Sequence, residues 1–239
     1  MITAMLAAFL VQGGPPLLTD NPATPGDGRF EINLAFKVEK FRHETLYKAP
    51  IIDFNYGIGE RAQLKAELPW LFVHEHPGPD ESGLCNALLG LKYRSLDQEQ
   101  DGIDLSMYPQ VEFRTNPHAR RAGLVGDELA FLFPAEAEKV IGPVSVNIEF
   151  GYLVVHGDED FWVWGIAVGR DLLDGVELLG EIHGTTGVRF DHGELVWNVG
   201  LRVKLSALNN LLVSAGRGIR GEGRSEPQFI GYLGLQFNF

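Results

Sequence analysis

The sequence of 239 residues lacks the features that mark several protein classes. It has one cysteine, Cys85, which rules out an internal disulfide. It has no run of about 18 apolar residues, which rules out a helical membrane span. Its 20 Lys and Arg stand against 32 Asp and Glu, and the net charge of −12 argues against a nucleic-acid partner, which would need a basic stripe. A hydrophobic content of 45% excludes disorder, so the chain must fold.

The chain is predicted to consist of three parts, two of which lie near its N-terminus. Residues 2–11 form an apolar run, and Val11, Gln12 and Gly13 follow with the spacing of a signal-peptidase site. No Lys or Arg precedes Arg29, so residues 1–13 resemble a secretory signal peptide without its basic region; an ordinary apolar terminus is the alternative. Residues 14–28 contain four prolines and three glycines, which predicts a flexible lead-in. Residues 29–239 are expected to form one folded unit.

The folded unit alternates between apolar and polar residues along most of its length. In the last stretch, residues 229–239, Phe229, Leu233 and Phe237 share one parity while Gln236 and Asn238 share the other. A period of two indicates a β-strand with one apolar face. Eleven further segments show the same period: 29–39, 47–56, 64–72, 85–94, 103–114, 129–136, 144–152, 162–168, 176–183, 195–205 and 210–216. Pro69 in the third segment predicts a local defect.

Two architectures fit this alternation, a closed membrane barrel and a soluble β-sandwich. None of the twelve segments carries a charge in the middle of its apolar face. Long connections (74–82, 116–126, 185–193, 217–228) alternate with short ones (57–60, 140–143, 171–175, 206–209), which is typical of extracellular loops and periplasmic turns. Connections 43–46 and 95–102 fit this pattern less well. We therefore predict an all-β fold: a single closed, antiparallel, up-and-down transmembrane β-barrel of about 12 strands in a bacterial outer membrane.

The barrel prediction assigns residues to two surfaces. The charged parity is expected to line the lumen, with Glu31, Lys37, Asp53, Lys65, Glu67, Lys92, Glu112, Arg114, Glu149, Glu181, Arg202 and Lys204 as the candidate lining residues. The terminal strand resembles the C-terminal assembly signal of outer-membrane β-barrels, with Phe229, Leu233, Leu235, Phe237 and Phe239 as the candidate residues. The expected partners are therefore membrane lipid, lipopolysaccharide, the barrel assembly machinery and a small solute.

Candidate chemical sites are few. The loop containing His74, His76 and Asp80 has ligand types that suit a metal, but its glycine and prolines favour a solvated loop. Residues 157–160 are acidic but lack the spacing of a calcium loop. His183 lies near Thr185 without a nucleophile elbow. The glycine-rich stretch 216–224 lacks the strand-then-helix context of a phosphate loop and favours a basic external loop that contacts lipopolysaccharide phosphates. We predict no enzyme activity, cofactor or metal.

One family resemblance rests on three stretches: the lead-in from Gly14 to Asp20, the strand 30–38, and the turn and strand from Tyr56 to Trp70. Together they resemble outer-membrane transporters of the MetA-pathway phenol-degradation family. The resemblance implies a barrel that passes small, in some cases aromatic or hydrophobic, molecules. A narrow channel or facilitator is the favoured function. The alternatives are a structural outer-membrane protein with a plugged lumen and a soluble periplasmic β-sandwich that binds ligands.

Overall fold

The computed structural model describes residues 14–115, 129–221 and 226–239. Its strands and its one short helix are, in chain order, β1 (Phe30–Lys40), β2 (Glu44–Ile58), β3 (Ala62–Glu75), β4 (Asp80–Leu84), β5 (Ala87–Leu96), α1 (Gln98–Asp101), β6 (Asp104–Met107), β7 (Gln110–Phe113), β8 (Ala130–Ile141), β9 (Val144–Val155), β10 (Phe161–Leu173), β11 (Val176–Gly187), β12 (Gly193–Lys204), β13 (Asn209–Arg220) and β14 (Phe229–Asn238). Among these residues no helix is long and apolar enough to cross a membrane.

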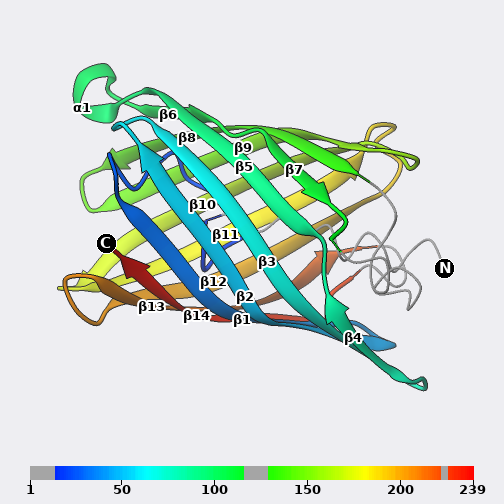
Figure 1. Cartoon of the computed structure of the whole chain (residues 1–239). Helices are drawn as coiled ribbons and strands as arrows, with labels where there is room; N and C mark the ends of the chain where they lie inside the picture. The colour runs from blue at the N-terminus through cyan, green and yellow to red at the C-terminus, as the bar shows by residue number, and fades with distance from the viewer. Residues whose placement is uncertain (1–13, 116–128, 222–225) are drawn as a thin grey trace.

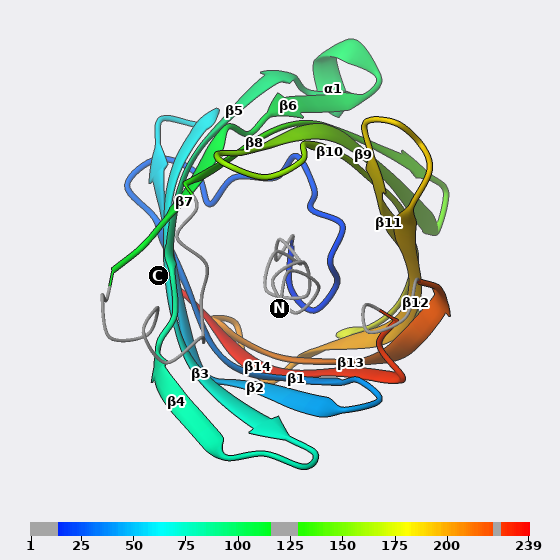
Figure 2. The ribbon, with the colours of Figure 1, turned by 90° about the vertical axis from the view of Figure 1, so that its right-hand side faces the viewer.

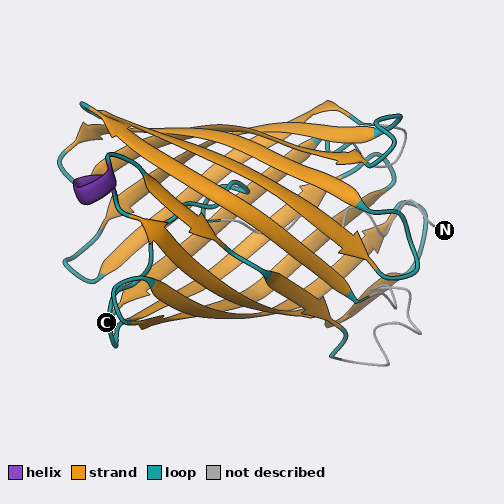
Figure 3. Ribbon diagram, turned by 90° about the horizontal axis from the view of Figure 1, so that it is seen from above, coloured by secondary structure: helices purple, strands orange, loops and turns teal. Residues whose placement is uncertain are grey.

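The strands form one closed antiparallel barrel (Figures 1 and 3). Both β4 and β5 pair with β3, and both β6 and β7 lie between β5 and β8. Each of these two pairs therefore acts as a single barrel strand, and the fourteen segments make a barrel of 12 strands. This confirms the predicted fold class and excludes the soluble β-sandwich, because the sheet closes on itself instead of packing against a second one.

Closure depends on the first and last strands. β1 and β14 pair in register from Glu31 with Asn238 to Lys40 with Phe229. The backbone of Phe239 extends this seam, since its N–H donates to the Phe30 carbonyl at 2.9 Å and its own carbonyl accepts from the Phe30 N–H at 3.1 Å. The terminal strand thus pairs with the first strand and closes the predicted barrel.

The two faces of the wall differ as the sequence period requires. Large apolar side chains point outward and are exposed, for example Leu34, Ile166 and Leu233 at 47, 48 and 51% of their surface. Charged and amide side chains of the other parity are buried, because the barrel surrounds them. An exposed apolar belt of this extent requires lipid around it, so the barrel spans a membrane.

The connections define two ends. We call the end with residues 59–61, 142–143, 174–175 and 205–208 the turn end; the C-terminus and α1 also lie there (Figure 1). The other is the loop end. Helix α1 occupies the long connection 95–102 that the alternation of loop lengths did not predict. The prediction of a long loop at residues 74–82 is wrong. β3 and β4 continue through most of this stretch and leave only residues 76–79 as a turn.

Two strands depart from the sequence pattern at prolines. Pro109 has no N–H for the ladder, and the predicted strand 103–114 is divided there into β6 and β7. In β2 the register shifts between Lys48 and Ile51, around Pro50. The shift reverses the parity, so Lys48 is buried inside the barrel although strict alternation from Asp53 would turn it outward.

The segment predicted to be a flexible lead-in lies inside the barrel. Figure 2 shows much of the dark blue trace that precedes β1 within the ring of strands. Residues 15–20 are buried, and Thr24 reaches the turn end, where its hydroxyl donates to the Glu60 carbonyl at 3.0 Å. The prolines and glycines prevent this stretch from joining the sheet, but carboxylates of the barrel wall bind its backbone. We call residues 14–25 the lumen segment.

Candidate functional site in the barrel lumen

The lumen contains many charged side chains, and more of them are acidic than basic. Eight acidic and four basic side chains are buried there among the described residues. The acids are Asp20, Glu39, Asp53, Glu67, Glu136, Glu149, Glu181 and Glu194, and the bases are Lys37, Lys48, Lys65 and Lys92. Ion pairs neutralise part of this charge: Lys37 Nζ lies 3.1 Å from Glu39, and Lys65 Nζ lies 3.4 Å from Asp53.

The structure places most of the candidate lining residues within the barrel. Seven are buried: Lys37, Asp53, Lys65, Glu67, Lys92, Glu149 and Glu181. Glu31, Glu112 and Arg202 are half-buried, while Arg114 and Lys204 lie at strand ends and are exposed. Neighbouring strands bring the buried side chains together; for example, Asp53 on β2 is directly opposite Glu67 on β3.

Glu181 binds the backbone of the lumen segment. Its two carboxylate oxygens accept hydrogen bonds from the N–H groups of Leu18 at 2.8 Å and Thr19 at 2.7 Å. Asn198 on the neighbouring strand β12 donates its amide to the same carboxylate at 2.6 Å. A carboxylate that accepts two consecutive backbone N–H groups gives them partners that an extended, proline-rich segment cannot find within itself.

Asp20 forms the second attachment. Its N–H donates to Glu149 at 2.9 Å, and its carboxylate lies 3.1 Å from the Lys92 ammonium. Lys92 also lies 3.1 Å from Glu136, and it donates to the Asn21 carbonyl. Lys92 therefore bridges the segment and the wall. Its ammonium lies between the carboxylates of Asp20 and Glu136, so the buried lysine is not an isolated charge.

Further contacts lie at and before the first of these attachments. Ser214 donates to the Pro16 carbonyl at 2.7 Å, and Arg202 donates to the Pro15 carbonyl at 3.4 Å. Leu17 packs against Ala167 and Leu179, while Leu18 packs against Val196 and Ile230. The lumen segment therefore has both polar partners and apolar sockets on the wall.

A polar cavity remains beside the segment. It has a volume of about 350 Å³ and lies between residues 14–25 and the wall formed by β1, β2, β3, β5, β12, β13 and β14. Its lining includes Glu31, Asp53, Lys65, Tyr108 and Arg202. Water and small polar solutes fit such a surface, because every charged group in it keeps a polar neighbour.

Five buried charged residues of the lumen are not among the candidate lining residues. Glu39 and Glu136 lie on the charged parity of segments 29–39 and 129–136, and the other three escaped the sequence prediction for different reasons. Asp20 lies in a stretch without alternation, and no local pattern shows that it enters the barrel. Lys48 is turned inward by the shift in β2. Glu194 lies one residue before the predicted start of its strand, and extending the alternation of residues 195–205 by one position would have found it.

The chemical candidates of the sequence are placed as follows. His74 contacts Asp80 across the β3–β4 hairpin, and the ring centroids of His74 and His76 are 4.1 Å apart. His183 is buried in the lumen wall, and neither of its ring nitrogens has a hydrogen-bond partner among the described residues. The glycine-rich stretch 216–224 continues β13 as far as Arg220, and residues 222–225 lie outside the described part.

No family model and no curated protein matches the sequence. Among solved structures, the chain is similar to an outer membrane channel from Pseudomonas putida F1, with a TM-score of 0.75 and 13% identity over 92% of this chain and 98% of that one. It is also similar to the NanC porin (TM-score 0.60, 9% identity, 86% and 98% covered) and to the KdgM porin in complex with disordered oligogalacturonate (0.58, 11%, 87% and 99%).

These likenesses show the fold, which is that of outer-membrane channel and porin barrels. The finer resemblance to the MetA-pathway family goes beyond what they show. With the closed barrel and its apolar outer belt, they place the protein in the outer membrane, as predicted.

Proposed function

We propose that the protein is a narrow outer-membrane channel for small cations and uncharged polar molecules, and that the lumen segment closes it at rest. The observation that carries the proposal is the pairing of an acidic lumen with a segment bound inside it by hydrogen bonds and one lysine bridge. Rings of one charge sign bias permeation towards ions of the other sign. Four more acids than bases are buried in the described lumen, so cations are favoured.

The nature of the wall supports polar solutes over aromatic or hydrophobic ones. The cavity of about 350 Å³ is lined by carboxylates, ammonium groups and amides, including Asp53, Asn55, Gln63 and Lys65. A hydrophobic molecule that crossed this surface would have to displace the water of charged groups without replacing their hydrogen bonds. Porins with which this chain shares its fold also have polar lumens as a class.

A structural protein with a permanently plugged lumen is the second candidate. The number of attachments favours it: Leu18, Thr19 and Asp20 each donate a backbone N–H to a wall carboxylate. The two candidates differ in one measurable property, which is whether the segment leaves its place on the time scale of permeation.

A reversible lock on the segment tests the choice. A Cβ on Gly165 would lie 2.3 Å from the Thr19 Oγ1 atom and 3.0 Å from its Cγ2 atom, so the two positions meet directly. A small outward shift of the lumen segment would bring cysteines there to the Cβ separation of about 3.5–4.5 Å that a disulfide needs. We suggest Thr19→Cys with Gly165→Cys in a Cys85→Ala background, with the two single-cysteine proteins as controls. Conductance is measured in planar bilayers before and after reduction, and reversal potentials are measured in a salt gradient.

For a gated channel, the oxidised protein should be silent and the reduced one should conduct with a preference for K⁺ over Cl⁻. Silence under both conditions, with controls that are also silent, would support the plugged structural protein. Anion preference of the reduced protein would refute the proposed selectivity.

A further inference from the structure

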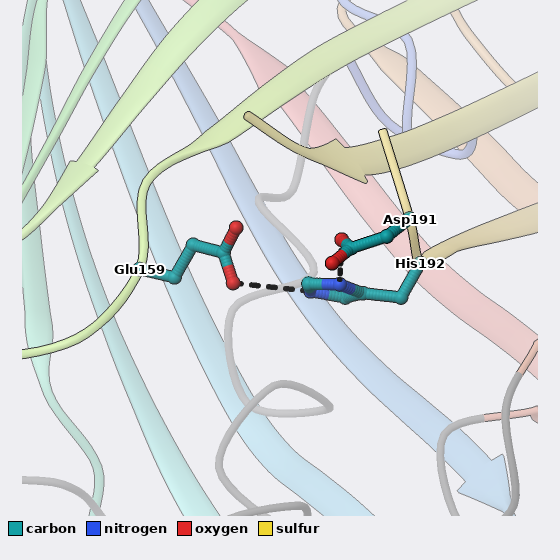
Figure 4. A group of neighbouring side chains, drawn as sticks. All are labelled: Glu159, Asp191 and His192. Carbon is teal, nitrogen blue, oxygen red and sulfur yellow. Dashed lines mark hydrogen bonds and ion pairs between the residues drawn. The ribbon is translucent and has the colours of Figure 1, made fainter. Parts of the chain in front are cut away.

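Two neighbouring connections at the loop end bring a histidine and two carboxylates together. Glu159 lies in the connection between β9 and β10, and Asp191 and His192 lie in the connection between β11 and β12. Their ligand atoms all lie within 4.8 Å of one another, and among the described residues no other group of three His, Cys, Asp or Glu meets this condition. Figure 4 shows the three side chains converging from the two connections. We call them the loop cluster.

The imidazole of His192 stands between the two acids. Its Nδ1 lies 2.7 Å from Asp191 Oδ1, and its Nε2 lies 3.6 Å from Glu159 Oε2 (Figure 4). A carboxylate at Nδ1 accepts a hydrogen bond from the Nδ1–H group, so the lone pair is on Nε2, on the side of Glu159. This is the arrangement by which an acid orients a metal-binding histidine.

The backbone holds the two connections against each other. The Val188 N–H donates to the Asp160 carbonyl at 3.2 Å, which joins the two connections directly. The Gly187 N–H donates to the His192 carbonyl at 3.1 Å, which closes the second connection on itself. Asp160 accepts a hydrogen bond from the Tyr152 hydroxyl at 2.8 Å, and this fixes the residue beside Glu159.

Gly187 lets the cluster form. A Cβ at this position would lie 2.6 Å from His192 Cε1, 2.9 Å from Nε2 and 3.1 Å from Glu159 Oε1, so any larger residue would force the imidazole and the carboxylate apart. The Oε1 atom of Glu159 is shielded from solvent and has no hydrogen-bond partner among the described residues. A shielded carboxylate oxygen without a donor costs free energy unless a cation or a donor occupies the space in front of it.

We propose that the loop cluster binds a divalent transition-metal ion of the zinc type and thereby ties the two connections together. His192 Nε2 and the Glu159 carboxylate are the direct ligands, and Asp191 is a positioning residue that acts through Nδ1. Water completes the coordination. Two ligands about 2.0–2.1 Å from a tetrahedral zinc ion lie roughly 3.3 Å apart, so the separation of 3.6 Å needs little adjustment.

The imidazole selects the type of ion. Calcium and magnesium take oxygen ligands almost exclusively, whereas imidazole nitrogen suits zinc, copper and nickel. The partial exposure of the cluster, with the side chains of Glu159 and His192 at 28 and 31%, leaves a path for the ion to enter.

Zinc binding to the full chain tests the proposal. The protein is prepared without a polyhistidine tag, refolded in detergent, and titrated with ZnCl₂ by calorimetry. His74 and His76 are replaced by alanine in every sample, because their hairpin also offers imidazoles. In this background, the variants are His192→Ala, Glu159→Gln, Asp191→Asn and Gly187→Ala, and His156→Ala is the matched control. His156 is an exposed histidine of the same connection as Glu159 but is not part of the loop cluster.

We expect one zinc ion per chain in the background protein and in the His156→Ala control. His192→Ala and Gly187→Ala should weaken binding at least 100-fold, and Glu159→Gln should weaken it at least tenfold. Asp191→Asn keeps an oxygen that accepts a hydrogen bond from the Nδ1–H group and should weaken binding about tenfold. Heat-modifiable migration on a gel confirms that each variant is folded. Absence of zinc binding in the folded background protein, or equal binding after His192→Ala, would overturn the proposal.

Discussion

Replacement of Glu181 by alanine should release the lumen segment. The change removes the acceptor of the Leu18 and Thr19 N–H groups, and both groups lie in the buried part of the lumen. A buried donor left without a partner costs about 1–3 kcal/mol. Two donors together should shift the equilibrium between bound and displaced segment by about 2 kcal/mol or more, which corresponds to roughly a 30-fold rise in the displaced fraction. Water that enters the space after the mutation can accept hydrogen bonds from the two N–H groups, so we take the lower end of the range for each donor.

Single-channel recording in planar bilayers measures this fraction as the open probability. Glu194→Gln is the matched control, because Glu194 is also a buried lumen carboxylate but makes no hydrogen bond to the lumen segment in the described structure. We expect the open probability to rise for Glu181→Ala and to stay at the wild-type value for Glu194→Gln. An unchanged open probability for Glu181→Ala, or an equal rise for both variants, would refute the assignment of Glu181 as the anchor of the segment.

Three further predictions concern the membrane wall, the seam and the loop cluster. Ile166→Arg places a cation at mid-height on the outer face and should lower the free energy of unfolding by about 2–4 kcal/mol, whereas Leu205→Arg at the turn end should cost about 1 kcal/mol or less; urea unfolding in lipid vesicles measures both. Removal of Phe239 deletes both of its backbone hydrogen bonds to Phe30 and should reduce the amount of protein in the outer membrane without changing the ion selectivity of the assembled fraction; normal membrane levels would contradict it. Zinc affinity should fall as the pH is lowered from about 7.5 to 5.5, because protons compete with zinc for the imidazole, and one proton should be displaced per zinc ion bound. The hydrogen bond from His192 lowers the pKa of Asp191, whose carboxylate therefore stays charged through this range. Displacement of two protons would contradict the proposed roles.

The barrel wall could be predicted from the sequence because its environment repeats every two residues. Lipid outside and charges inside force the same alternation on each strand, as Leu34 and Ile166 on one face and Asp53 and Glu181 on the other show. The prediction was wrong where a local event interrupts the period. The shift around Pro50 turned Lys48 inward, and Pro109 divided one strand into β6 and β7.

The site could be predicted only in part, because its other half comes from contacts between distant residues. Nothing near Asp20 in the sequence shows that it meets Lys92, 72 residues away. Prolines and glycines indicate only that residues 14–28 do not form a regular element. Whether such a stretch stays in solvent depends on donors and acceptors that the wall presents. The loop cluster is similar, since Glu159 and His192 approach each other only because β10 and β11 form a hairpin.

The carboxylates that bind the lumen segment are also part of the acidic lumen, so gating and selectivity should be coupled. When the segment leaves, Glu181 and Glu149 lose its backbone N–H groups and face the permeating solute instead. Glu181→Gln should therefore raise the open probability and, at the same time, lower the K⁺ over Cl⁻ preference, because it removes one unit of a buried acid excess of four. Glu194→Gln removes the same charge and should lower the preference alone. Reversal potentials measured on the same recordings separate the two effects, and a Glu181→Gln channel that opens more often with wild-type selectivity would show that the segment and the solute use different groups.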